Sequence, residues 1–104
     1  MQRTEWYEIG DLKFEWDIYK ASHNLVKHGV SFWEAATVFV DPLVTEIRDP
    51  DHSEYESRMV LIGRSLEQRM LVVVHVEREP RLRIISARPA SGAERKAYEE
   101  GESR

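Results

Sequence analysis

Three apolar segments joined by very short connections constrain the fold of this chain more than any other feature. They span residues 57–64, 70–77 and 82–87, and their β-branched content is typical of strands. Residues 65–69 link the first pair, and Glu79-Pro80 marks the turn between the second pair. Because the connectors are so short, the second half of the chain predicts an antiparallel meander.

Helix signals flank this meander on both sides. Asp17 caps a helix that Gly29 ends, after a short strand over residues 13–16. A capping-box spacing, S-x-x-E, starts a second helix over residues 32–39 and recurs from Ser91 to Glu94, before a terminal helix that ends near residue 100. Between the second helix and the meander, residues 43–47 read as a further strand.

These elements predict an α+β fold in a single domain over residues 1–104. The core spans about residues 13–100, and residues 101–104 form a frayed tail. We expect a mostly antiparallel sheet of four to five strands, packed with two N-terminal helices and one C-terminal helix.

The first predicted helix carries two different faces. Ile18, Ala21 and Leu25 share an apolar face, and Lys20, Asn24 and Lys27 share the opposite, polar one. A polar stripe of this kind most simply faces solvent.

Composition excludes several kinds of protein. The chain has no cysteine, so it can form no disulfide, no thiolate zinc site and no cysteine nucleophile. No apolar run approaches the ~20 residues that cross a bilayer, which favours a cytoplasmic protein. We interpret His23 as a surface histidine and His75 as a strand histidine, and we expect neither a metal nor a cofactor.

Charge is divided unevenly along the sequence. Residues 1–57 hold 12 acidic against 5 basic side chains, whereas residues 58–95 hold 4 against 8. Arginine supplies 11 of the 15 basic residues, and its planar fork suits phosphate and carboxylate groups. A polyanion or an acidic protein could therefore dock on the basic part, although a solvated arginine-rich sheet face explains the same charges. A basic segment of a partner would complement the acidic part.

Several blocks of residues, in order and spacing, resemble the BrnT family of bacterial type II toxins. They are Phe14-Glu15-Trp16-Asp17, Lys20, Asn24, Lys27-His28-Gly29-Val30-Ser31-Phe32, Ala35, Arg83-Ile84-Ile85-Ser86-Ala87-Arg88, Glu94-Arg95 and Tyr98. The resemblance implies a fold similar to the RelE and ParE toxins and RNA cleavage that arrests translation and growth. It also implies a BrnA-type antitoxin that silences the toxin and connects it indirectly to operator DNA.

Metal-independent RNA cleavage needs a base for the 2'-hydroxyl proton, cations for the charged phosphorane and an acid for the departing 5'-oxygen. Glu56 is our preferred base, and its alternative role is an ion pair with a neighbouring arginine. His28 is a candidate acid, and its alternative role is to stabilise the end of a helix. The candidate catalytic residues are Lys20, Lys27, His28, Glu56, Arg64 and Arg88, the two lysines by virtue of the resemblance.

RNA contacts are assigned to Arg58, Arg83 and Tyr98, each with a structural alternative. Arg58 and Arg64 share one face of a strand, where they contact phosphate or only rim a core. Arg83 and Arg88 fall on opposite faces unless the strand bends near residues 86–87. Arg88 alternatively pairs with Glu94, and Tyr98 alternatively packs on the sheet. The other large aromatic residues fit core or partner contacts better than base stacking: Trp16, Phe32, Trp33 and Phe39.

Three functions follow from these observations. The first is a metal-independent endoribonuclease toxin. The second is a catalytically silent module of the same fold, which binds its antitoxin, and through it operator DNA, without cleaving RNA. The third is a DNA-gyrase poison of the ParE kind.

Overall fold

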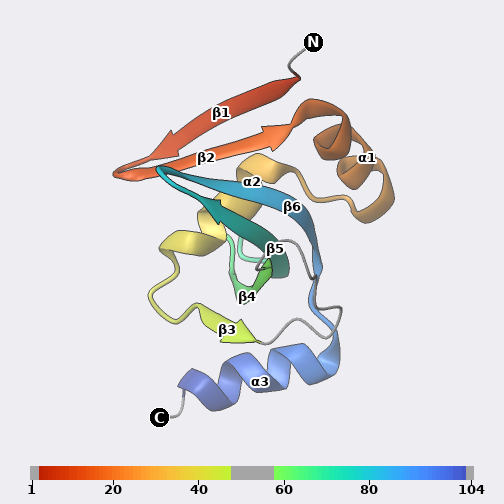
Figure 1. The fold of residues 1–104 in the computed structure, drawn as a ribbon. Coiled ribbons are helices and arrows are strands. Elements are labelled where there is room, and N and C mark those ends of the chain that lie inside the picture. The colour runs from red at the N-terminus through yellow and green to blue at the C-terminus, as the bar shows by residue number, and fades with distance from the viewer. Residues whose placement is uncertain (1–2, 48–57, 103–104) are drawn as a thin grey trace.

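Six strands, three α-helices and one short 3-10 helix make up the part of the chain that the structure describes. The structure, a computed structural model, describes residues 3–47 and 58–102. The elements, in chain order (Figure 1), are β1 (Thr4–Ile9), β2 (Leu12–Asp17), α1 (Ile18–His28), α2 (Phe32–Thr37), η1 (Val38–Val40), β3 (Thr45–Ile47), β4 (Arg58–Arg64), β5 (Met70–Arg78), β6 (Arg81–Pro89) and α3 (Gly92–Glu102). The α+β class is confirmed.

All six strands form one mixed sheet in the order β1-β2-β6-β5-β4-β3. The predicted meander β4-β5-β6 is antiparallel throughout. Two features correct the expected sheet of four to five strands. An additional N-terminal strand, β1, pairs with β2 across a turn that Gly10 begins at φ 57°, and β2 pairs in parallel with β6.

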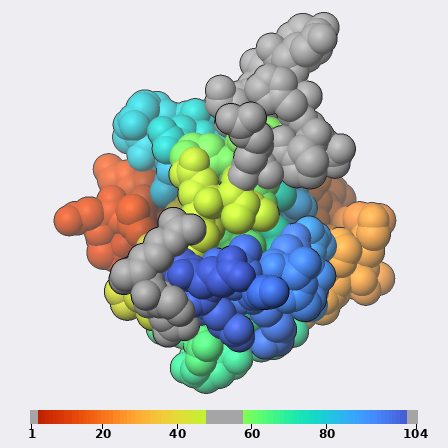
Figure 2. All heavy atoms as spheres, turned by 90° about the horizontal axis from the view of Figure 1, so that it is seen from below, coloured from red at the N-terminus to blue at the C-terminus, as the bar shows by residue number. Residues whose placement is uncertain are grey.

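Helices cover both faces of the sheet. Alternate residues of β5 divide between two clusters: Leu71 and Val73 pack with α2 and β2, while Met70 and Val72 pack with Tyr98 of α3. Figure 2 shows α3, in blue, lying beside β3 on the surface of the molecule. Within residues 3–47 and 58–102, no helix is long and apolar enough to cross a membrane.

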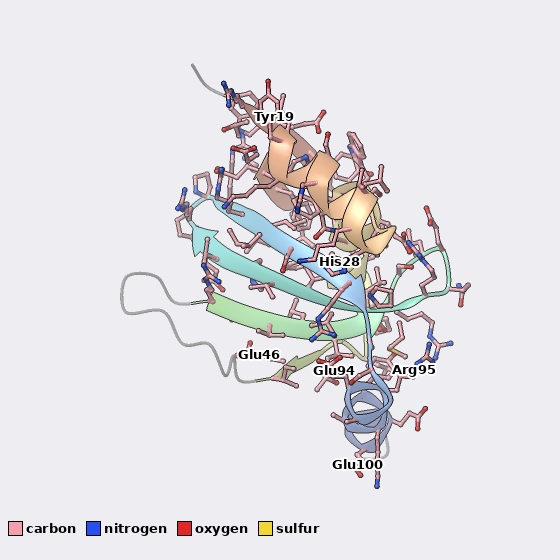
Figure 3. All side chains as sticks on the ribbon, turned by 90° about the vertical axis from the view of Figure 1, so that its right-hand side faces the viewer. Tyr19, His28, Glu46, Glu94, Arg95 and Glu100 are labelled. Carbon is pink, nitrogen blue, oxygen red and sulfur yellow. The ribbon has the colours of Figure 1, made fainter. Side chains whose placement is uncertain are left out.

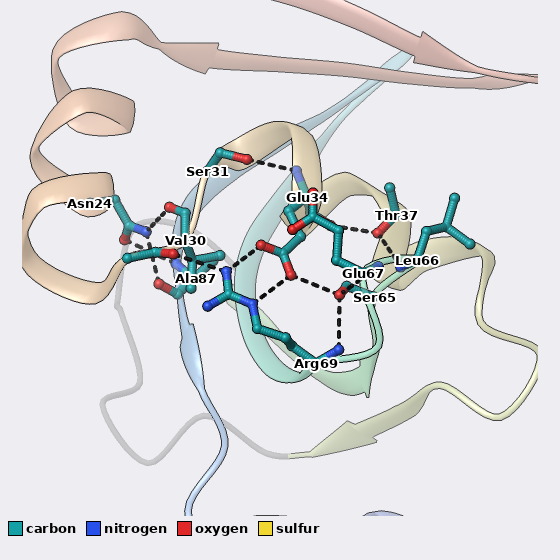
Figure 4. A network of polar contacts seen from close by, with 11 residues as sticks. Asn24, Val30, Ser31, Glu34, Thr37, Ser65, Leu66, Glu67, Arg69 and Ala87 are labelled. Carbon is teal, nitrogen blue, oxygen red and sulfur yellow. Dashed lines mark hydrogen bonds and ion pairs between the residues drawn. The ribbon is translucent and has the colours of Figure 1, made fainter.

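A partly buried ion-pair network joins α2 to the turn between β4 and β5. The capping box predicted the start of α2 correctly, since Ser31 Oγ accepts the Glu34 N–H at 3.0 Å. The Glu34 carboxylate, however, turns inward and is 4% exposed. It accepts hydrogen bonds from Ser65 Oγ at 2.8 Å and from the Arg69 guanidinium (Figure 4). Arg69 lowers the pKa of Glu34, and a second Arg69 nitrogen donates to the Gly29 carbonyl at 2.9 Å. The network therefore holds the end of α1 against the sheet.

His75 is the titratable group that this packing affects most clearly. The side chain is 3% exposed and packs edge-on against Phe39, with ring centroids 4.8 Å apart. Its Nδ1 has no hydrogen-bond partner among the described residues. Burial lowers the pKa of His75 to about 4, because it disfavours the cation.

We predict that stability falls as the pH drops from 6.5 to 4. In this range the unfolded chain binds a proton at His75 and the folded chain does not, so the loss amounts to about 3 kcal/mol. Urea unfolding across this pH range measures it. A His75→Leu variant should lose this dependence of the unfolding free energy on pH, whereas His23→Gln, at an exposed histidine, should keep it. The parental pH dependence in His75→Leu would show that His75 is not its source.

Candidate functional site

The two parallel strands β2 and β6 separate soon after they meet. They pair only at Phe14 with Leu82 and at Glu15 with Arg83. The chain then leaves β2 into α1, which runs along the remaining part of β6 (Figure 3). This divergence leaves a wedge between α1 and the second half of β6, and it leaves that edge of β6 without a neighbouring strand.

Asn24 of α1 takes the place of the missing strand. Its Nδ2 donates to the carbonyl of Ala87 at 2.8 Å, and its Oδ1 accepts the Ala87 N–H at 3.1 Å. The same Nδ2 donates to the Val30 carbonyl at 2.9 Å (Figure 4). The side chain thus satisfies both polar groups of Ala87, as the backbone of a strand would. Asn24 is the buried residue of α1, which corrects its interpretation as part of a solvent-facing stripe.

A cleft of about 450 Å³ opens in the wedge beside Asn24. Lys20, His23 and Lys27 follow one flank of α1, and the two lysines lie about 10 Å apart along the helix axis. The lining contains two ammonium groups, two imidazoles and no carboxylate, which suits an anion. The lining residues are Tyr19, Lys20, His23, Asn24, Lys27 and His28 from α1, with Ile85 and Ser86 from β6.

A β-bulge shapes the β6 side of the cleft. Ser86 pairs with Val74 and Ile84 pairs with His75, so Ile85 is an extra residue in β6. The shift also brings Arg83 and Arg88 to one face, because their partners on β5, Val76 and Val72, lie an even number of residues apart. The sequence places these arginines on opposite faces unless the strand bends, and the bulge supplies that irregularity.

Arg83 lies near the Lys20 end of the cleft. It donates to Glu15 at 2.6 Å. Asp17 caps α1 by accepting the backbone N–H groups of Tyr19 and Lys20. The hydrogen bond from the Lys20 backbone lowers the pKa of Asp17, and the charges of Arg83 and Lys20 lower it further. Both cations therefore act on one carboxylate at the start of the helix.

Arg88 and Tyr98 contribute to the attachment of α3. Arg88 forms a two-pronged ion pair with Glu94, with both bonds at 2.7 Å. The hydrogen bond from Arg88 lowers the pKa of Glu94 to about 2. Tyr98 is 2% exposed, and its hydroxyl donates to Asp41 at 2.9 Å. In this structure the Tyr98 ring is thus enclosed rather than presented to an RNA base.

The remaining candidates lie away from the cleft or outside the described residues. Arg58 and Arg64 occupy the two ends of β4, and neither lines the cleft. The backbone of Arg64 donates to Asp41 at 2.8 Å, which places it near the attachment of α3. Glu56 lies outside the described residues. The structure thus brings together Lys20, Lys27 and His28, whereas Arg83 lies outside the lining of the cleft and acts on Asp17.

Sequence reasoning missed His23, Tyr19 and the β6 residues of the cleft. His23 falls three residues after Lys20 and four before Lys27, a spacing that places all three on one helix flank. That signal was present, but a lone histidine suggested a surface position. The contribution of Ile85 and Ser86 depends on the bulge, which leaves no readable pattern.

No group of three or more side chains that could hold a metal ion occurs among residues 3–47 and 58–102. The cleft therefore offers histidine and lysine, and no carboxylate cluster, to whatever binds there.

A family model described as "Ribonuclease toxin, BrnT, of type II toxin-antitoxin system" matches residues 16–94 of the chain. The chain belongs to the BrnT family. The resemblance drawn from the sequence blocks is thereby confirmed, and the matched region contains α1, the bulge of β6 and every residue that lines the cleft. As a member of the BrnT family, the chain is a ribonuclease toxin of a type II toxin-antitoxin system.

A solved BrnT structure has a similar fold. The crystal structure of the Brucella abortus ribonuclease toxin, BrnT, is 23% identical, with a TM-score of 0.56. The similarity covers 73% of this chain and 92% of that one. Among curated proteins, no sequence relative matches the chain.

We predict that Asn24→Asp strongly destabilises this BrnT protein. The carboxylate has nearly the same shape, but it cannot donate to the Val30 and Ala87 carbonyls, and its charge would be buried against them. The expected loss is about 3 kcal/mol or more in the free energy of unfolding at pH 7, measured with urea. His23→Gln, on the neighbouring exposed residue, should change it by less than about 0.5 kcal/mol. Equal stability of Asn24→Asp and the parent would show that the amide does not hold α1.

Proposed function

We propose that this protein is a metal-independent endoribonuclease that cleaves RNA in the α1–β6 cleft. The observation that carries the proposal is the lining of that cleft, in which Lys20, His23, Lys27 and His28 surround one space without a carboxylate. Cleavage takes place in the cytoplasm and arrests translation and growth. Membership of a ribonuclease toxin family supports the reaction class.

Lys20 and Lys27 approach the reacting phosphate from its two sides, since both line the cleft along α1. Their ammonium groups neutralise the charge that develops on the phosphorane in the transition state, which is the largest electrostatic demand of the reaction. Asn24 lies between them in the helix and fixes their direction through its bonds to Ala87. Arg83 adds positive charge near Asp17, at the start of α1, although its guanidinium also forms an ion pair with Glu15.

His23 and His28 supply the proton transfers. Histidine is the side chain type that most readily exchanges a proton near neutral pH. One imidazole takes the proton of the 2'-hydroxyl, whose oxygen attacks phosphorus. The bond from phosphorus to the 5'-oxygen breaks, and the other imidazole protonates that oxygen. The products are a 2',3'-cyclic phosphate and a free 5'-hydroxyl. Glu56 stays a candidate base, outside the described residues.

A BrnA-type antitoxin neutralises the toxin, and operator DNA is reached only through that antitoxin. The type II family supports an antitoxin partner. The relation to RelE and ParE toxins stays a prediction of the sequence resemblance, as do the roles of Arg58, Arg64, Arg88 and Tyr98 in RNA contact or catalysis.

We predict that Lys20→Ala and Lys27→Ala each lower kcat/KM for RNA cleavage about 100-fold, because each removes a cation from the developing charge. The assay uses purified toxin, RNA and excess EDTA. Lys96→Ala, the same change on α3, serves as the matched control and should cleave at the parental rate. Arg64→Ala tests the alternative position near Asp41.

The outcomes of this assay separate the competing functions. A large loss in Arg64→Ala with full activity in Lys27→Ala would move the site to the end of β4. Absence of cleavage by the parental protein, together with tight antitoxin binding, would favour the catalytically silent module. Activity that disappears in EDTA and returns with a divalent cation would overturn metal independence.

We also predict that the two lysines contribute to the salt dependence of RNA binding. Each phosphate contact on a single strand contributes about 0.7 to the slope of log K against log salt concentration. The double variant Lys20→Ala/Lys27→Ala should therefore lower the slope by about 1.4, measured with a 2'-O-methyl RNA that cannot be cleaved. The parental slope in this variant would mean that the lysines do not contact phosphate.

A further inference from the structure

A second hollow lies on the other flank of α1, between this helix and α2. It is an open groove of about 240 Å³, and its apolar lining consists of Ile18, Ala21, Leu25, Phe32 and Trp33. Several of these side chains are well exposed: Ile18 to 40%, Leu25 to 51% and Trp33 to 47%. Glu5 is the charged residue of the lining. We call this hollow the α1–α2 groove.

The groove exists because α1 is rotated against expectation. An amphipathic helix on a sheet normally turns its apolar stripe toward the core. Here Asn24 occupies the inward position, so Ile18 and Leu25 remain outside. Adjoining exposed apolar residues from two helices are typical of an interaction site rather than of an ordinary solvated surface.

The lining chemistry separates this groove from the cleft. No lysine or arginine lines it, so nothing in it would hold an RNA phosphate. Its volume is below the ~300–1,000 Å³ of typical small-molecule sites. An apolar groove of this size between two helices instead fits a few side chains from one face of a protein helix.

The walls of the groove are held by buried groups. Trp33 packs edge-on against Trp16 with ring centroids 5.7 Å apart, and Phe32 packs against the same ring at 5.9 Å. The Trp16 indole N–H donates to Glu5 at 2.9 Å, which fixes that carboxylate beside the groove. Because these contacts are already made, a ligand would enter a preformed surface and lose less entropy on binding.

We infer that the α1–α2 groove binds an amphipathic helix of the antitoxin. The apolar face of that helix inserts between Leu25 and Trp33, and a lysine or arginine beside it pairs with Glu5. The inference depends on the proposed antitoxin partner. Charge complementarity favours a basic residue on that helix, since Glu5 lines the groove and no lysine or arginine does.

The test compares two neighbouring positions of α1 that differ in their relation to the groove. Leu25 lines it, whereas Val26 is 88% exposed and does not line it. The full toxin, as Leu25→Glu or Val26→Glu, is titrated with the purified antitoxin that is encoded beside the toxin gene. Leu25→Glu should weaken binding at least about 30-fold, the effect of losing one central anchor residue. Val26→Glu should change the Kd by less than about 3-fold.

Two further measurements keep the result interpretable. Ile18→Glu, at the other end of the groove, should also weaken antitoxin binding, and thermal unfolding should show that every variant is folded. RNA cleavage by the free Leu25→Glu toxin should match the parental rate. Loss of antitoxin binding in a toxin that never cleaves RNA would uphold the groove and refute the nuclease proposal.

Two outcomes would overturn the inference. The first is parental affinity for the antitoxin in both Leu25→Glu and Ile18→Glu. The second is a change in the mass of the free toxin in solution on Leu25→Glu substitution, because the groove would then be occupied by a second copy of this chain.

Discussion

The pairing of the Asn24 amide with the backbone of Ala87 is the interaction on which the working surfaces of this protein depend. It replaces a strand where β2 has turned away from β6, and it determines which side of α1 faces inward. Lys20 and Lys27 consequently border the cleft, while Leu25 lies on the opposite flank of the helix. One buried side chain thus positions a cationic surface and an apolar surface together.

Features that depend on neighbours in the chain could be predicted from the sequence. Asp17 caps α1 and Gly29 ends it in the left-handed conformation at φ 70°, as their residue types indicate. The meander β4-β5-β6 also follows from local strand patterns and short turns. The parallel pairing of β2 with β6 could not be predicted, because it joins strands far apart in the sequence. The strand β1 was missed although its turn contains Gly10.

The candidate site shows the same division between local and distant information. Helical spacing correctly groups Lys20 with Lys27, since it sets the angle between side chains on one helix. It does not set which side of the helix faces the sheet, and the burial of Asn24 reverses the ordinary preference for apolar residues. Glu94 could be named from the sequence as a partner of Arg88, because the two lie six residues apart. Asp41, the partner of the Tyr98 hydroxyl, lies 57 residues away and could not be named in this way.

The way in which the sheet is terminated has a consequence for solubility. An open strand edge offers unpaired amides and carbonyls to other chains, and so it is a starting point for aggregation. The Asn24 side chain occupies that position at Ala87 of β6. At one of the two outer edges of the sheet, β3 has three residues within the described part of the chain, which is too short there to template a long ladder. Both arrangements reduce the strand edge that a second copy of the chain could extend.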